Sequence, residues 1–184
     1  MVLCALSAGG LAAQSGGIPP EWEVRKQMTA LAEHVQRVEP VLEQIHPEEW
    51  VKKGAPQAYV GQLSRTRAEI GYLVGSTKEL AAHPERMTTA LDTFFRMESV
   101  DAMLRSVAAG IRKYQNPAVA ELLQGLIADT SADRGKLRQY LVDLAADREQ
   151  QYKVMDQEAQ RCRSALSRQE RPAARPTPRQ EEHH

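Results

Sequence analysis

Hydrophobic residues recur at intervals of four and three along residues 21–46. The positions are Val24, Met28, Leu31, Val35, Val38, Leu42 and Ile45. This heptad spacing brings all of these side chains to one face of an α-helix. The helix is expected to end at His46, because Pro47 follows it. Pro40 lies off the apolar face, so we expect it to bend the helix without ending it.

The same spacing returns in a second segment that begins near Pro56 and ends before His83. Its positions are Tyr59, Leu63, Thr66, Ile70, Leu73, Thr77 and Leu80. The two threonines are expected to bond carbonyl groups of the preceding turn. Residues 47–55, between the two helices, resemble a short helical turn or structured loop. Trp50 in this loop is expected to cap the end of a core, which is commoner than a ligand platform.

A third helix is expected from Pro84 to about Tyr114, with a wide apolar stripe. The stripe consists of Met87, Ala90, Leu91, Phe94, Phe95, Met97, Val100, Leu104, Val107, Ala108 and Ile111. Phe94 and Phe95 are the only phenylalanines of the chain, and at least one is expected at the centre of the bundle. The connections between these helices are short, which favours antiparallel packing.

The longest predicted helical stretch is 116–168, which contains no proline after Pro117 and is opened by the helix-capping residue Asn116. As one helix it would be ~75 Å long. A polar patch at 129–136 allows two interpretations. We prefer one continuous helix, because no proline intervenes. The alternative is a break in which Thr130 and Asp133 form a capping box and start a new helix.

These patterns predict an all-α protein, an antiparallel helical bundle of four main helices with a long C-terminal helix. Residues 18–168 are expected to form the bundle, and 169–184 a disordered tail rich in proline and arginine. The chain has 24 basic and 24 acidic residues. This balance argues against a general nucleic-acid binder, which needs an excess of Lys and Arg for phosphate contacts.

Residues 1–17 are apolar, small and uncharged. The run is shorter than the ~20 residues of a bilayer span and resembles a secretory leader, with a cut after Ala12 or Ala13. The basic residues that usually precede the apolar region are missing, and an uncut N-terminus is the alternative. We therefore expect an exported protein, periplasmic or extracellular, with no transmembrane span in the mature chain.

Cleavage would remove Cys4 and leave Cys162 as the only cysteine. An odd cysteine in an oxidising compartment is shielded, modified or paired with another chain. Cys162 lies on a sparse apolar stripe of the last helix. We expect it to be buried there as a small core residue, in preference to an intermolecular disulfide.

The motifs of common enzyme classes are absent from the sequence. It has no phosphate-binding glycine loop, no Gly-x-Ser-x-Gly elbow and no Cys-x-x-Cys. We therefore expect a protein that is not an enzyme and that holds no cofactor.

One pattern is compatible with a metal site. Glu43 and His46 form a Glu-x-x-His step on one helix face, as in di-metal carboxylate bundles. The further carboxylates available to such a site are Glu98, Asp101 and Asp133. A second Glu-x-x-His is missing, so a solvated carboxylate and a histidine favoured by the helix dipole are preferred. For Asp101 the ordinary expectation is an ion pair with Arg105, four residues on.

The sequence thus favours a non-enzymatic interaction or scaffold module of the cell envelope. Its C-terminal helix would bind a protein partner or a second copy of itself, with Met155, Cys162 and Leu166 as the contact residues. Charges of alternating sign along 143–163 are typical of a solvated face and also of the flanks of a helical dimer. The alternative function is a metal- or ligand-binding bundle that uses Glu43, His46, Glu98 and Asp101.

Overall fold

The computed structural model of the chain describes residues 17–169, and in that range it contains α-helices and no strand. The helices are α1 (Glu21–Gln36), α2 (Glu39–Glu43), α3 (Pro47–Lys52), α4 (Ala58–Ala82), α5 (Met87–Tyr114), α6 (Pro117–Asp129) and α7 (Ser131–Gln169). The predicted all-α fold is confirmed. The second and third predicted helices begin at Ala58 and Met87, slightly later than Pro56 and Pro84.

Two compact units make up the chain, one ending at Ala145 and the other beginning at Ala146. We call described residues 17–145 the bundle unit and 146–169 the C-terminal unit. The predicted bundle range, 18–168, therefore covers both. Residues 1–16 of the predicted leader, Cys4 among them, lie outside the described residues. Of the predicted tail, only residue 169 is described, and it is helical.

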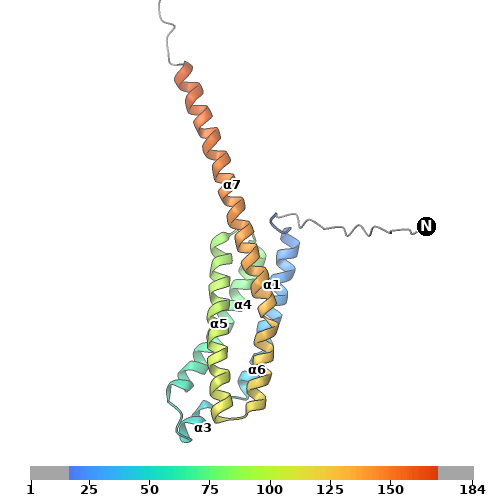
Figure 1. Cartoon of the computed structure of the whole chain (residues 1–184), viewed down its shortest axis with the longest axis vertical. Helices are drawn as coiled ribbons and strands as arrows, with labels where there is room; N and C mark the ends of the chain where they lie inside the picture. Colours follow the sequence, from blue (N-terminus) through green and yellow to red (C-terminus); the bar gives the residue numbers. More distant parts are fainter. Residues whose placement is uncertain (1–16, 170–184) are drawn as a thin grey trace, which may run out of the picture. The chain divides into compact units, whose positions relative to one another are not determined.

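The bundle unit has four antiparallel legs (Figure 1), formed by α1 with α2, by α4, by α5, and by α6 with the start of α7. Contacts along α5 show the direction of the last leg. Arg112 bonds Gln124 at 3.0 Å and Asp101 pairs with Arg134 at 3.3 Å. The predicted antiparallel bundle is therefore confirmed.

The first leg is not one bent helix as predicted, because α1 ends at Gln36 and α2 begins at Glu39. Pro40 has no N–H to donate to the carbonyl group of Gln36, and its ring would crowd that carbonyl in a continuous helix. Instead, the Val38 N–H bonds the Val35 carbonyl at 3.3 Å in a tighter turn. All seven residues of the predicted apolar face are nevertheless buried.

The long C-terminal segment is also divided, and the predicted single helix is corrected to two. α6 ends at Asp129, and α7 starts at Ser131. Thr130 does not form a capping box, because its Oγ1 donates to the Ile127 carbonyl at 2.8 Å. Helical bonding resumes at once, with the Arg134 N–H 3.1 Å from the Thr130 carbonyl oxygen. From there α7 continues without a break to Gln169.

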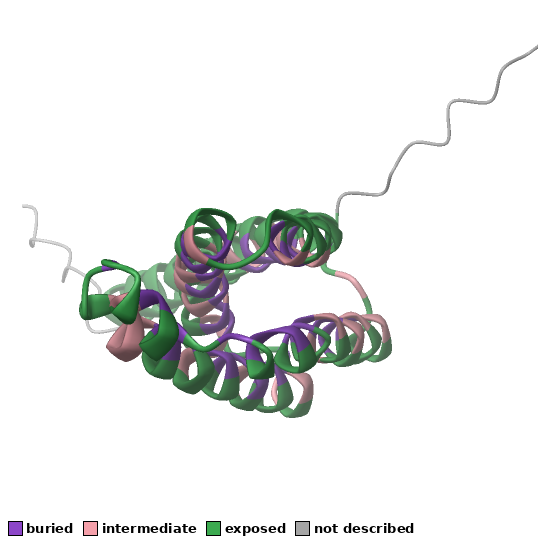
Figure 2. Cartoon of the chain, turned by 90° about the horizontal axis from the view of Figure 1, so that it is seen from below, coloured by how far each residue is buried: buried purple, intermediate pink, exposed green. Residues whose placement is uncertain are grey.

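Aliphatic side chains from all four legs fill the core. Figure 2 shows the buried faces of the helices turned toward the middle of the bundle unit. The largest fully buried side chains include Leu31, Leu42, Ile70, Leu73, Leu80, Ile111, Leu123, Leu137 and Leu144. Thr66 and Thr77 are also buried, and they bond the carbonyl groups of Gln62 and Val74, as expected for threonines on the apolar face.

The prediction for the phenylalanines is wrong. Phe94 is only half-buried, and Phe95 is 64% exposed. Thr93 takes the central position instead, and its Oγ1 donates to the Thr89 carbonyl at 2.8 Å. The apolar stripe of α5 is wider than the face that its neighbours cover, so residues at its edge remain accessible.

Trp50 closes one end of the core, as predicted. The residue is 2% exposed, and its ring centroid lies 5.6 Å from that of Tyr59 and 6.3 Å from that of Tyr114. Its Nε1 donates to Oε1 of Gln115 at 3.2 Å. Gly110 makes room for this cluster, because a Cβ there would lie 2.8 Å from Tyr59 and 2.9 Å from Trp50.

Candidate functional site

The C-terminal unit presents a helix whose side chains are exposed without exception from Arg148 to Arg168. Tyr152, Met155 and Leu166 are 73%, 69% and 60% exposed. With Ala159 and Cys162 they repeat at intervals of three, four, three and four. We call these five residues the C-terminal stripe. The predicted contact residues Met155, Cys162 and Leu166 thus share one helix face.

Cys162 is a free, exposed thiol, so the prediction that it is buried is wrong. Its position on an apolar stripe suggested a core residue. A stripe is buried only where another element covers it, and no described element covers this one. Its exposure excludes the shielded state, one of the three expected for this cysteine if Cys4 is removed with the leader.

Polar residues of the C-terminal unit pair with one another along the helix. Gln151 donates to Asp147 at 2.6 Å, and Gln160 donates to Asp156 at 3.1 Å. Arg161 pairs with Glu158 at 2.5 Å. Pairs three or four residues apart stabilise an isolated helix by a few tenths of a kcal/mol each, roughly 0.2–0.5. The helix therefore gains local support while its apolar stripe stays accessible.

The four metal-ligand candidates are not brought together. Glu43 and His46 are exposed, and Glu43 lines a pocket of about 180 Å³ with Glu39, Leu42 and Arg67. Gln44, the residue after Glu43, lies beside the C-terminal end of α5, because the Gln115 side chain donates to its carbonyl at 3.1 Å. Glu98 lies on α5 about 25 Å from Gln115, as the helix rise gives for their separation of 17 residues. No group of three or more metal-binding side chains occurs within residues 17–168.

Glu98 and Asp101 instead form ion pairs between α5 and α7. Arg134 lies 3.5 Å from Glu98 and 3.3 Å from Asp101. Asp101 also accepts from Arg105 at 2.8 Å, as predicted, and this hydrogen bond raises the pKa of the Arg105 guanidinium. Every carboxylate in this group faces an arginine, so the geometry is that of a link between helices.

A second polar contact, between α1 and α7, was not predicted. Nδ1 of His34 lies 2.5 Å from Oδ2 of Asp133, and the Asp133 side chain is only 7% exposed. Lys136 is 3.6 Å from the other carboxylate oxygen. Asp133 lies seven residues after Leu126 and four before Leu137, and this heptad spacing was the available signal for its burial. His34 stands beside the apolar face of α1, and no sequence feature pointed to its partner.

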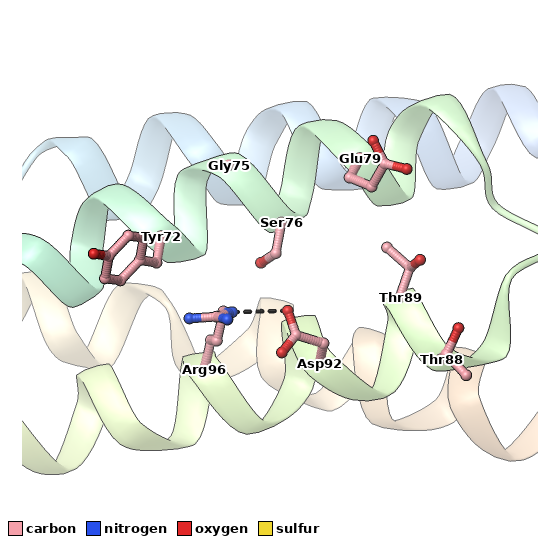
Figure 3. Close-up of a pocket in the computed structure, with 8 residues that line it drawn as sticks. All are labelled: Tyr72, Gly75, Ser76, Glu79, Thr88, Thr89, Asp92 and Arg96. Carbon is pink, nitrogen blue, oxygen red and sulfur yellow. Dashed lines mark hydrogen bonds and ion pairs between the residues drawn. The ribbon is translucent and has the colours of Figure 1, made fainter.

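A groove of about 400 Å³ lies between α4 and α5 (Figure 3). Tyr72, Ser76 and Glu79 on α4 face Thr89 and Arg96 on α5 across it. Its charged groups are already paired within the protein. Arg96 bonds Asp92 at 2.7 Å, which raises the pKa of the guanidinium, and Arg86 bonds Glu79 at 3.1 Å. The groove therefore presents neutralised charges and small hydroxyl groups.

The groove between α5 and the start of α7 is larger, about 630 Å³, and contains the two phenylalanines. Ser131 and Gly135 on α7 leave room beside Phe94 and Phe95, whose ring centroids are 5.9 Å apart. Arg134 and Arg138 line the same groove. It offers two aromatic rings beside two arginines.

Within residues 17–169, no helix combines the length and the apolar character that crossing a bilayer requires. The accessible apolar residues of the C-terminal unit, Tyr152, Met155 and Leu166 among them, form the candidate site. No family model, curated protein or solved structure matches the chain.

Proposed function

We propose that this protein is a non-enzymatic interaction module whose C-terminal unit binds another protein chain through the C-terminal stripe. The observation that carries the proposal is the exposure of every side chain from Arg148 to Arg168, with Tyr152, Met155 and Leu166 on one face. Apolar side chains aligned at heptad spacing are the usual recognition surface between helices.

The energetics of an unpacked helix support this function. Most of the stability of protein helices comes from the packing of an apolar face. The residues of the C-terminal stripe contribute nothing to the core of the bundle unit, which closes without them. Burial against a partner would gain about 25 cal/mol for each Å² of apolar surface.

We also propose that the protein acts outside the cytoplasm, in the cell envelope or beyond it. The support is the pattern of residues 1–17, which are apolar, small and free of charge. The intact mass of protein isolated from its own cells tests this part. A chain that starts after Ala12 or Ala13 agrees with export, and a chain that retains Met1 contradicts a cleaved leader.

Native mass spectrometry of protein isolated from its own cells tests the interaction. The unaltered chain is compared with a stripe variant, Met155→Lys with Leu166→Lys, which introduces charge on the apolar face. The matched control is Gln157→Lys with Ser164→Lys, which adds the same charge on the opposite face. We expect the unaltered chain and the control to appear in a complex, and the stripe variant to appear alone.

Two results would contradict the proposal. One is a single uncomplexed chain in all three samples, and the other is a complex that the stripe variant retains. Circular dichroism of each variant serves as the folding control, because all four substituted positions are exposed. A loss of helical signal confined to the stripe variant would be followed by Met155→Gln with Leu166→Gln, which removes apolar surface without adding charge.

A further inference from the structure

We propose that the partner of the C-terminal stripe is a second copy of this chain, aligned in parallel and in register. This inference rests on the function proposed above and names the partner for the same surface. It follows from the heptad positions of the stripe and from the charges on either side of it.

In heptad notation Tyr152, Ala159 and Leu166 occupy a positions, while Met155 and Cys162 occupy d positions. In a parallel two-stranded coil each of these residues packs against its own copy in the other chain. Arg148 holds the preceding d position and ends the apolar run. The proposed contact therefore extends from residue 152 to residue 166, and it brings the two Cys162 side chains into one layer.

The charges beside the stripe favour the parallel arrangement. Glu158 is at a g position and Arg163 at the following e position, and these two positions face each other between parallel chains. Two symmetric Glu158–Arg163 pairs would form. In the single chain Nε of Arg163 donates to the Ala159 carbonyl at 3.3 Å, and no ion pair of Arg163 occurs among the described residues. Its charge is thus available to a second copy. Glu158 pairs with Arg161 of its own helix, but both side chains are exposed and such surface pairs are weak, so Glu158 can exchange this partner for Arg163 of a second copy.

The antiparallel arrangement is less favourable. In antiparallel coils e positions face e positions and g positions face g positions. If Tyr152 of one chain packs against Cys162 of the other, Asp156 faces Asp156 of the other chain, and Glu158 faces Glu158 of the other chain. Only Glu149 with Arg163 would attract. Like charges at these positions destabilise pairing and select against an orientation.

Thiol–disulfide exchange with oxidised glutathione tests the register. The Cys162 thiolate attacks the glutathione disulfide, which releases one glutathione and leaves a mixed disulfide. The Cys162 thiolate of the second copy then displaces the second glutathione, so that the two electrons lost by the pair reduce one glutathione disulfide. The full chain carries Cys4→Ser, so that only this thiol reacts.

The matched control moves the thiol to the opposite face, as Cys162→Ser with Ser164→Cys. We expect the unmoved thiol to form the linked dimer on the order of a hundredfold faster. The proposed dimer holds the two Cys162 thiols together at a millimolar local concentration, whereas thiols on the opposite face point apart and must link between dimers at micromolar concentration. Equal rates for the two chains would overturn the register. A further chain, Tyr152→Cys with Cys162→Ser, is mixed with the Cys162 chain, and preferential mixed linkage would overturn the parallel orientation.

Sedimentation equilibrium of the Cys162→Ser chain measures the association without any disulfide. We expect a dimer that becomes a monomer on adding Met155→Lys with Leu166→Lys, and remains a dimer with Gln157→Lys and Ser164→Lys. A monomer at every concentration would overturn self-association. If the native complex then contains a different protein and still requires the stripe, the proposed function stands and this inference fails. If no complex exists either, both fail.

Discussion

Nδ1 of His34 lies 2.5 Å from Oδ2 of Asp133, and this contact joins α1 to the first turns of α7. The two residues are 99 positions apart in the chain, so the contact closes the bundle unit between its first and last legs. The carboxylate is nearly buried, which makes its partner necessary, because a buried polar group without one is costly.

We expect His34 and Asp133 to stabilise the fold together. A double-mutant cycle with His34→Ala and Asp133→Ala should give a coupling energy of about 1.5–3 kcal/mol, as for hydrogen bonds to charged groups. Urea unfolding of the four chains measures it. The exposed pair Arg25–Glu21, 3.0 Å apart, is the matched control and should couple by less than ~1 kcal/mol. Equal coupling in the two cycles would contradict a special role for the interhelical pair.

Gly110 should not tolerate a methyl group. Gly110→Ala would place a Cβ within 3 Å of the rings of Tyr59 and Trp50, and such overpacking typically costs about 1–3 kcal/mol. The matched control is Gly71→Ala on α4, where no atom beyond the neighbouring residues and the local helix backbone lies within 4 Å of the added Cβ. There the better helix former should stabilise by about 0.5–1 kcal/mol. Thermal unfolding measures both changes, and a stabilised Gly110→Ala chain would refute this packing.

The hydroxyl group of Tyr140 donates to the carbonyl of Pro84, in a buried contact between α7 and the turn before α5. Tyr140→Phe should lower the free energy of unfolding by roughly 1–2 kcal/mol, because the carbonyl loses this donor. Tyr72→Phe is the control, since that ring is 60% exposed on α4. It should change stability by less than about 0.5 kcal/mol. Denaturant titrations compare the two, and indistinguishable midpoints would count against the buried bond.

Hydrogen exchange should separate the two units. Amides of buried α7 residues such as Leu137 and Leu144 should be protected by the global stability of the bundle unit, whereas amides from Arg148 to Arg168 should exchange through local fraying. If a second copy covers the C-terminal stripe, protection of this stretch should rise with chain concentration. Mass spectrometry at two concentrations measures it. The Met155→Lys with Leu166→Lys chain should lose the concentration dependence, and if it does not, the stripe is not the contact.

Much of the fold could be predicted because apolar spacing is a local property of helices. The seven apolar positions of residues 21–46 are all buried. The two threonines on the apolar face of α4, Thr66 and Thr77, bond carbonyl groups of the preceding turn, as predicted. Helix ends were less predictable. Pro40 interrupts its helix where only a bend was expected, and Thr130 ends α6 although the sequence contains no breaker there.

The candidate site was predicted in part. Periodicity alone aligned Met155, Cys162 and Leu166 on one face. It could not decide whether another element covers that face, and so the burial of Cys162 was predicted wrongly. The same limit applies to Phe95, which belongs to an apolar stripe but lies beyond the surface that neighbouring helices cover.

The sequence by itself thus determined which segments are helical, which face of each is apolar, and that the legs are antiparallel, because spacing and short connections act locally. Only the tertiary structure decided which apolar faces are covered and which polar groups meet. His34 and Asp133, or Trp50 and Gln115, come together through the packing of whole helices. Such partners depend on the relative placement of distant segments, and no local pattern in the chain encodes it.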